Sequence, residues 1–240
     1  MSPVGYAAVA ALANVAGALV VIRRSEVGVR TLELALAFGA GFMLSVAMLG
    51  MLPEVFATDA AAAPWLLAGF LAVHLVQHVL TPHFHFGEET HHVSRAAGVT
   101  AALGLSLHAF FDGVAIASGF LVSGQLGLLL FLAVFLHKLP EGLSIASLSL
   151  AGGFSKERAL ALSVVPAIAT LLGGVLTGVA TPLATHGLAL AAGVTIYVAA
   201  SNLIPEFQGK RSWRMATAFF GGVAAFLLSG MLLGALPGMG

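Results

Sequence analysis

The sequence contains no cysteine and very few charged residues. Its 240 residues include ten lysines and arginines and ten aspartates and glutamates, so 8% of the chain is charged and the formal net charge is zero. Soluble domains carry about 25% charged residues, and a chain this poor in charge cannot cover a water-facing surface. The lack of cysteine excludes disulfides, thiolate metal sites and cysteine nucleophiles. The balanced charge offers no basic surface, so no nucleic-acid partner is expected.

Long apolar runs are what the sequence has instead, since 59% of its residues are hydrophobic. A membrane-spanning helix needs roughly 20 apolar residues, and the runs here are unbroken rather than alternating, which favours helices over a barrel. The first run has no basic region before it and is expected to be a span, not a cleaved signal. The predicted fold is an all-α integral membrane protein with a single transmembrane domain, residues 1–240. Its eight predicted spans are 3–22, 31–52, 64–82, 97–120, 125–151, 158–179, 186–207 and 215–236.

The basic residues predict the orientation of these spans. Nine of the ten lie in or beside the joints that follow the odd-numbered spans, namely Arg23, Arg24, Arg30, Arg95, Lys156, Arg158, Lys210, Arg211 and Arg214. Cytoplasmic loops carry the excess of lysine and arginine. We therefore expect these joints in the cytoplasm and both termini outside, in the periplasm or the extracellular space. The tenth basic residue, Lys138, falls inside the fifth span.

Two internal repeats link spans of opposite direction. Residues 40–54 resemble residues 192–206, with the same Gly, Val-Ala and Pro-Glu positions 152 residues later. Residues 108–118 resemble residues 137–147, including the polar positions. Inverted-repeat transporters are built in this way, with the substrate site at the repeat interface near the bilayer midplane. Chance similarity between low-complexity apolar helices is the alternative, and it is more open for the first pair.

Four polar residues lie near the middle of the fourth and fifth spans. His108 and Asp112 are four residues apart and share one helix face, and so do His137 and Glu141. The short joint at 122–124 makes the two spans antiparallel neighbours, so two imidazoles and two carboxylates can converge. Charged groups at this depth are expensive and functional by default. This donor set, without thiolate, suits zinc, iron(II), manganese or cobalt rather than copper(I). The alternative is a hydrogen-bonded group that merely joins two helices.

Three further residues shape the same segment. Gly113 and Gly142 follow the two carboxylates and are expected to let helices approach closely. Pro140 cannot donate a backbone hydrogen bond, so it is expected to loosen the fifth span beside the site.

The two motifs, His-x-x-x-Asp-Gly at 108–113 and His-x-x-Pro-Glu-Gly at 137–142, resemble the paired metal motifs of the ZIP (Zrt/Irt-like) transporter family, in its prokaryotic form. The Leu-Pro-Glu and Ile-Pro-Glu segments at 52–54 and 204–206 and the histidine-bearing loop at 83–92 also resemble that family. The resemblance implies eight transmembrane helices with inverted repeats in a 3+2+3 arrangement, a homodimer, and motion of one helix bundle against another. It also implies downhill or proton-linked movement of a divalent metal into the cytoplasm.

The chain departs from the binuclear members of that family at three places. Where those members carry second-site ligands, this sequence has Ala109, Lys138 and Val165. The comparison implies a mononuclear site, with the Lys138 ammonium standing where a second cation would sit. The family's ligand on the second span, a methionine in some members, matches Met43, which in an apolar helix is otherwise ordinary core filler.

Other polar residues are candidates for roles along the ion's path. His74 and His78 share a helix face in the cytoplasmic half of the third span, where they form an exit relay or a simple interhelical hydrogen bond. Histidine-bearing tracts can bind metal weakly, and the loop after this span is such a tract or a plain solvated loop. Candidate gates are Glu54 at the outer mouth and Glu206 at the inner mouth, with Asn202 one turn away. The loop histidines are His83, His85, His91 and His92.

These observations together predict a transporter that moves Zn²⁺ into the cytoplasm across the cell (inner) membrane. Fe²⁺, Mn²⁺, Co²⁺ and Cd²⁺ are the alternative substrates, and no bound cofactor and no enzymatic activity are expected. Two other functions remain open at this point. One is an intramembrane hydrolase that uses a metal-bound water, and the other is a metal sensor without flux.

Overall fold

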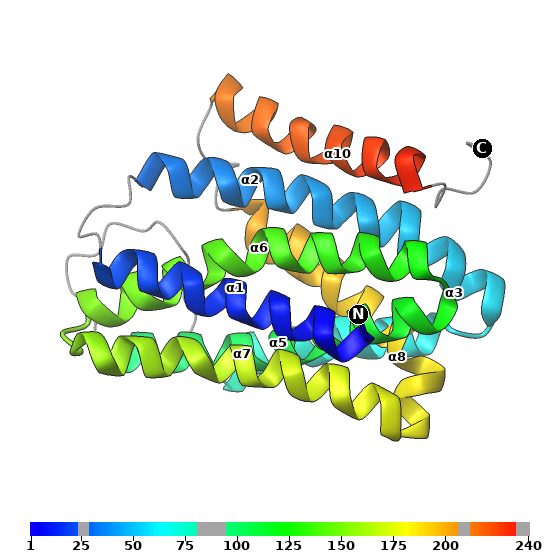
Figure 1. Cartoon of the computed structure of the whole chain (residues 1–240), viewed down its shortest axis with the longest axis horizontal. Helices are drawn as coiled ribbons and strands as arrows, with labels where there is room; N and C mark the ends of the chain where they lie inside the picture. Colours follow the sequence, from blue (N-terminus) through cyan, green and yellow to red (C-terminus); the bar gives the residue numbers. More distant parts are fainter. Residues whose placement is uncertain (24–28, 81–94, 206–211, 234–240) are drawn as a thin grey trace.

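The computed structural model describes residues 1–23, 29–80, 95–205 and 212–233 (Figure 1). Every element in these ranges is a helix, which confirms the expected all-α class. In a bilayer each backbone N–H and C=O must be satisfied within the chain, and a helix does so. The elements, with η for π-helical segments, are α1 (Pro3–Arg23), α2 (Val29–Ser45), η1 (Val46–Met51), α3 (Leu52–Thr58), α4 (Ala63–Leu75), η2 (Val76–Leu80), α5 (Arg95–Val122), α6 (Gly124–Ala151), α7 (Lys156–Val179), α8 (Thr181–Tyr197), η3 (Val198–Leu203) and α10 (Trp213–Leu233).

Seven helical stretches of the described chain are long and apolar enough to cross a membrane. They are Pro3–Arg23, Glu33–Thr58, Ala102–Val122, Gly124–Ala151, Lys156–Val179, Thr181–Leu203 and Trp213–Leu233. The chain is thus a multi-pass membrane protein. The third predicted span, 64–82, is not among these seven; it corresponds to α4 and η2, and its last two residues lie outside the described ranges.

The second membrane helix runs further than hydropathy predicts. Its predicted end is residue 52, but the helix continues through η1 and Pro53 to Thr58. A proline ring clashes with the carbonyl of the residue four positions earlier in a regular α-helix. The wider π-helical turn just before Pro53 relieves that clash, so the chain stays helical.

The same distortion recurs at the equivalent place in the other half of the chain. η3 begins 152 residues after η1, at Val198 against Val46, and is likewise followed by a proline, Pro205. After each segment the backbone N–H bonds to the carbonyl five residues earlier, as from Ile204 to Ala199 at 3.1 Å. The two resembling segments therefore share a backbone irregularity as well as residues, which is compatible with the predicted inverted repeat.

Four pairs of helices pack through reciprocal glycines. In α1 and α6, a Cβ atom at Gly142 would overlap the carbonyl oxygen of Asn14, and one at Gly17 would overlap that of Leu139. Small residues let membrane helices approach this closely. The same arrangement joins α5 to α7 through Gly113 and Gly173, α2 to α10 through Gly41 and Gly222, and α4 to α8 through Gly69 and Gly193. The repeats match α5 with α6 and α2 with α8. Under this matching the α1–α6 pair corresponds to the α5–α7 pair, and the α2–α10 pair corresponds to the α4–α8 pair, so the packing is compatible with the predicted repeat.

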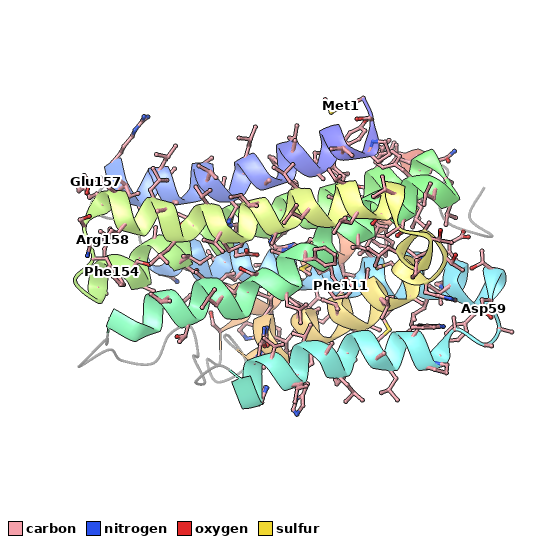
Figure 2. The ribbon with its side chains drawn as sticks, turned by 90° about the horizontal axis from the view of Figure 1, so that it is seen from below. Met1, Asp59, Phe111, Phe154, Glu157 and Arg158 are labelled. Atoms are coloured by element: carbon pink, nitrogen blue, oxygen red, sulfur yellow. The ribbon has the colours of Figure 1, made fainter. Side chains whose placement is uncertain are left out.

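The pairs form two groups of helices. α1, α5, α6 and α7 all contact one another and make a four-helix bundle, while α2, α4, α8 and α10 lie beside it. Figure 1 shows the start of α1, the end of α10 and the short α3 at the same end of the molecule. Figure 2 shows Met1 and Asp59 at this end, and Phe154, Glu157 and Arg158 at the opposite end. The joint between α6 and α7 is thus on the other side from the first residue of the chain.

Candidate metal centre

The four polar residues singled out from the sequence lie together between α5 and α6. His108 and Asp112 come from α5, and His137 and Glu141 come from α6. One donor atom from each lies within 4.8 Å of the others, and all four side chains are buried. The turn between the helices explains the convergence. Ser123 alone separates them, and its hydroxyl oxygen caps α6 by accepting the Leu126 N–H.

The distances between donor atoms fit a small divalent ion. His108 Nε2 and His137 Nε2 each lie 3.3 Å from Asp112 Oδ2, and His108 Nε2 lies 3.6 Å from Glu141 Oε2. Ligands of a tetrahedral zinc with bonds of about 2.0–2.2 Å are about 3.4 Å apart. These three distances are therefore already close to the spacing that a zinc ion requires, and the whole donor set lies within 4.8 Å.

The hydrogen bond of His137 to the backbone leaves the other ring nitrogen facing the centre. His137 Nδ1 lies 2.8 Å from the carbonyl oxygen of Ala133. A carbonyl can only accept, so Nδ1 carries the hydrogen, and in the neutral ring Nε2 presents its lone pair to Asp112. This is the backbone support that metal-binding histidines commonly have. His108 Nδ1 and Glu141 Oε1 are buried polar atoms without a hydrogen-bond partner in the described part of the chain.

Lys138 joins the same group from α6. Its side chain is 0% exposed, and its Nζ lies 2.8 Å from Asp112 Oδ2 and 2.7 Å from Glu141 Oε2. The sequence comparison placed an ammonium where a second cation would sit. In the structure that ammonium is paired with both carboxylates of the first site, through the oxygens that also face the histidines.

Neighbouring helices brace the site. Gly113 and Gly142 do allow close approach, as expected, but toward the outer helices. Gly113 packs on the carbonyl of Thr170 in α7, and Gly142 packs on that of Asn14 in α1. From α2, a Cβ atom at Gly39 would lie 3.7 Å from the Cβ of His137. The turns that carry the candidate ligands therefore have a helix backbone behind each carboxylate and α2 beside one histidine.

The remaining residues of the predicted site are placed as follows. Met43 is buried on α2, one turn beyond Gly39, so the two positions share a helix face. Ala109 is fully buried beside His108, whereas Val165 on α7 is 37% exposed. Neither alanine nor valine offers a metal ligand.

The predicted exit histidines pair with each other. The rings of His74 and His78 stack with centroids 4.4 Å apart, and His78 Nδ1 lies 2.9 Å from the hydroxyl of Tyr197. This contact joins η2 to α8, as the hydrogen-bonding alternative requires. Of the candidate gates, Glu54 in α3 and Asn202 in η3 are half-buried. The positions outside the described residues are His83, His85, His91, His92 and Glu206.

Sequence reasoning missed one polar residue that supports the site. Asn14 is fully buried in α1, its Nδ2 donates to the carbonyl of Ser163 in α7 at 2.9 Å, and its own carbonyl faces Gly142. It thus ties together the two helices that flank α6. A single amide within an otherwise apolar span was the signal available in the sequence, since buried polar groups need partners.

The chain is similar in sequence to known zinc transporters. A sequence model of the family described as ZIP Zinc transporter matches residues 87–233. Zinc transporter ZIP13 of Pongo abelii is 28% identical over 213 residues, which cover 80% of this chain and 63% of that protein. Zinc transporter ZIP9-B of Xenopus laevis is 30% identical over 158 residues, 60% of this chain and 52% of that protein. Zinc transporter ZIP4 of Mus musculus is 35% identical over 116 residues, 47% of this chain and 17% of that protein. The chain therefore spans less than two thirds of each of these relatives.

Proposed function

The chain belongs to the ZIP zinc transporter family, and on that premise we propose that it carries Zn²⁺ across the membrane into the cytoplasm through one intramembrane site. The observation that carries the proposal is the convergence of four buried ligand side chains, His108, Asp112, His137 and Glu141. Charged and ionisable residues inside membrane helices usually mark an ion pathway.

The proposed site binds zinc by replacing its hydration shell. Two imidazole nitrogens and two carboxylate oxygens supply four ligands, the usual number for zinc. Met43, which is buried on α2, would add a thioether ligand while α2 lies against the site. Fe²⁺, Mn²⁺, Co²⁺ and Cd²⁺ are the competing substrates, because the donor set holds no feature that excludes them. We propose no catalytic role for the site.

The direction and path are also part of the proposal. The basic joints face the cytoplasm by the charge rule, so both termini lie outside the cell (inner) membrane. All four ligands lie on α5 and α6, within the bundle of α1, α5, α6 and α7, so the ion would move with that bundle against α2, α4, α8 and α10. On release it would pass His74 and His78 and reach the 83–92 loop. We also propose a homodimer, which the family resemblance implies. In lipid nanodiscs its protein mass would be twice that of one chain.

Uptake into liposomes tests the proposal. Purified protein is reconstituted into vesicles that contain a zinc chelator, and labelled zinc is added outside. We expect saturable uptake well above that of protein-free vesicles, and inhibition by a competing divalent ion. A hydrolase or a sensor would bind zinc without moving it. Binding of zinc by the reconstituted protein with no uptake above the background would overturn the transport function.

A further inference from the structure

Lys138 is the feature of the site that metal binding alone does not explain. Its ammonium is fully buried and touches both carboxylates, at 2.8 Å from Asp112 Oδ2 and 2.7 Å from Glu141 Oε2. It is a cation and cannot ligate a metal ion. It lies on the same helix as two of the ligands and three residues from Glu141, so it would travel with the site in any movement of that bundle.

The lysine changes the charge that the site carries in each state. With neutral histidines, Asp112 and Glu141 contribute −2 and Lys138 contributes +1, so the metal-free site is −1. A divalent ion brings it to +1. Without the ammonium the same states would be −2 and 0. The energy of holding a charge in a low-dielectric medium rises with the square of that charge. With the lysine, the metal-free and metal-bound sites therefore carry the same energetic cost of a buried charge. Without it, the metal-free site alone carries a net charge, and that charge is doubled.

A carrier must cross the membrane twice in each cycle, once loaded and once without its ion. We propose that Lys138 is a tethered counter-cation that allows the metal-free site to return across the membrane without binding a second ion. This inference rests on the proposed transport function and concerns its return step. It means that net zinc movement needs no other cation to be carried back.

The shared oxygens give the lysine a role in release as well. An incoming ion must share Asp112 Oδ2 and Glu141 Oε2 with the ammonium, or displace it from them. When the ion leaves, the ammonium regains both contacts at once, and no step with two unpaired buried carboxylates is required. Unpaired charges in a membrane interior are the arrangement that proteins avoid.

Comparison of net uptake with zinc–zinc exchange tests the inference. Net uptake into zinc-free vesicles requires the metal-free carrier to return, but exchange between zinc-loaded vesicles and labelled zinc outside does not. In Lys138→Met, which keeps the length of the side chain and removes its charge, we expect exchange to persist while net uptake falls. The ratio of exchange to net uptake should rise at least about tenfold, because a site of −2 must cross. Lys138→Arg should keep the wild-type ratio.

Two controls keep the experiment decisive. Lys156→Met removes an exposed lysine at the start of α7 and should leave the ratio unchanged. The wild-type protein tests the inference without any variant, because its net uptake should proceed at a rate comparable to its exchange. If Lys138→Met does not fold, Lys138→Gln replaces it, with zinc binding of the detergent-purified protein as the test of folding.

Three results would overturn the inference. In folded Lys138→Met, equal loss of exchange and net uptake would mean that the lysine organises the site, and retention of both would mean that it only aids insertion. In the wild type, exchange more than about tenfold faster than net uptake would mean that the return step is not eased. Failure of the transport function itself has a different signature, since the wild type would then show neither exchange nor net uptake.

Discussion

At the scale of single residues, the donor atoms of the site come from two adjacent helices and from two kinds of side chain. Each kind responds differently to substitution and to protons, so the assignment of the ligands can be tested separately from the transport cycle. His186 provides a matched control, because it is not one of the four candidate ligands. Its ring stacks on that of Trp65, with the ring centroids 4.3 Å apart.

Replacing any one ligand by alanine should abolish saturable zinc uptake. In His108→Ala, Asp112→Ala, His137→Ala and Glu141→Ala, the ion loses a group that replaces part of its hydration shell. We expect at least about a tenfold loss of uptake at low zinc, as found for loss of groups that support metal sites, with normal insertion and size-exclusion behaviour. His186→Ala should transport normally. Near-normal uptake in all four variants would refute the ligand assignment.

Protons should compete with zinc at the site. An imidazole binds metal only through an unprotonated nitrogen, so the histidine ligands must stay neutral in the loaded state. The sign follows directly: acidification favours the protonated, metal-free form. Zinc affinity measured by equilibrium dialysis should weaken as the pH falls from about 7.5 to about 5.5, the range in which histidines commonly titrate, and should recover on return to neutral pH. A flat affinity over this range would show that histidine is not a ligand.

The four candidate ligands could be predicted from sequence because spacing alone places them. A four-residue interval sets His108 with Asp112 and His137 with Glu141 on one helix face, and a one-residue joint brings the faces together. The partners of Lys138 could also be predicted, since a lysine inside a membrane helix needs an anionic partner, and Glu141 lies three residues on with Asp112 on the neighbouring helix. The hydrogen bond between His78 and Tyr197 joins residues 119 apart in sequence, so no local sequence pattern predicts it.

At the scale of secondary-structure elements, reciprocal glycines set the distances between helices. In α7, a Cβ atom at Gly173 would overlap the carbonyl of Phe110 in α5, whereas one at Gly178 would meet nothing within 4 Å. Gly173→Ala must therefore push α7 away from the helix that carries His108 and Asp112. Gly178 offers a matched substitution on the same helix.

Gly173→Ala should lower the free energy of unfolding by about 1–3 kcal/mol, the usual effect of overpacking. It should also reduce zinc affinity, because α5 loses its support. Gly178→Ala should leave both unchanged or slightly increase stability. Reversible unfolding in mixed micelles and equilibrium dialysis would measure the two effects. Equal effects of the two substitutions would contradict the packing described here.

Helix positions were largely predictable and helix irregularities were not. Unbroken apolar runs predict membrane helices because the bilayer demands internal backbone hydrogen bonds. The passage of the second helix through Pro53 was missed, since proline normally signals a helix end. Only the structure shows that a π-helical turn accommodates it, and that the same solution recurs before Pro205.

At the scale of the whole molecule, the proposed orientation can be tested at the two ends of the helix bundle. Figure 2 places Asp59 and Glu157 at opposite ends of the bundle. In the orientation that we propose from the charge rule, the end with Glu157, Lys156 and Arg158 faces the cytoplasm. The chain has no cysteine, so a single introduced cysteine reports its own position without background.

In intact cells, a membrane-impermeant thiol reagent should label Asp59→Cys and should not label Glu157→Cys until the membrane is opened. Both positions lie in joints between helices or at a helix start, so both should tolerate the change. Labelling of Glu157→Cys from outside, with Asp59→Cys protected, would show that the topology and the direction of transport are the reverse of those proposed.

The grouping of helices into two bundles could not be predicted from sequence. The chain has 29 glycines, and those that form interhelical contacts look the same in sequence as those, such as Gly178, that face open space. Pairing depends on which carbonyl each glycine meets, which is a property of the assembled structure. The internal repeats reduce the number of possible helix pairings but do not identify the correct one.

The central claim is that two imidazoles and two carboxylates hold the transported ion. X-ray absorption at the zinc edge, on purified protein loaded with one equivalent of zinc, tests it most directly. The account predicts nitrogen and oxygen ligands at about 2.0–2.2 Å, with the multiple-scattering pattern of two imidazoles, reduced to one in His137→Ala. A spectrum without imidazole, or one that His108→Ala and His137→Ala leave unchanged, would contradict it.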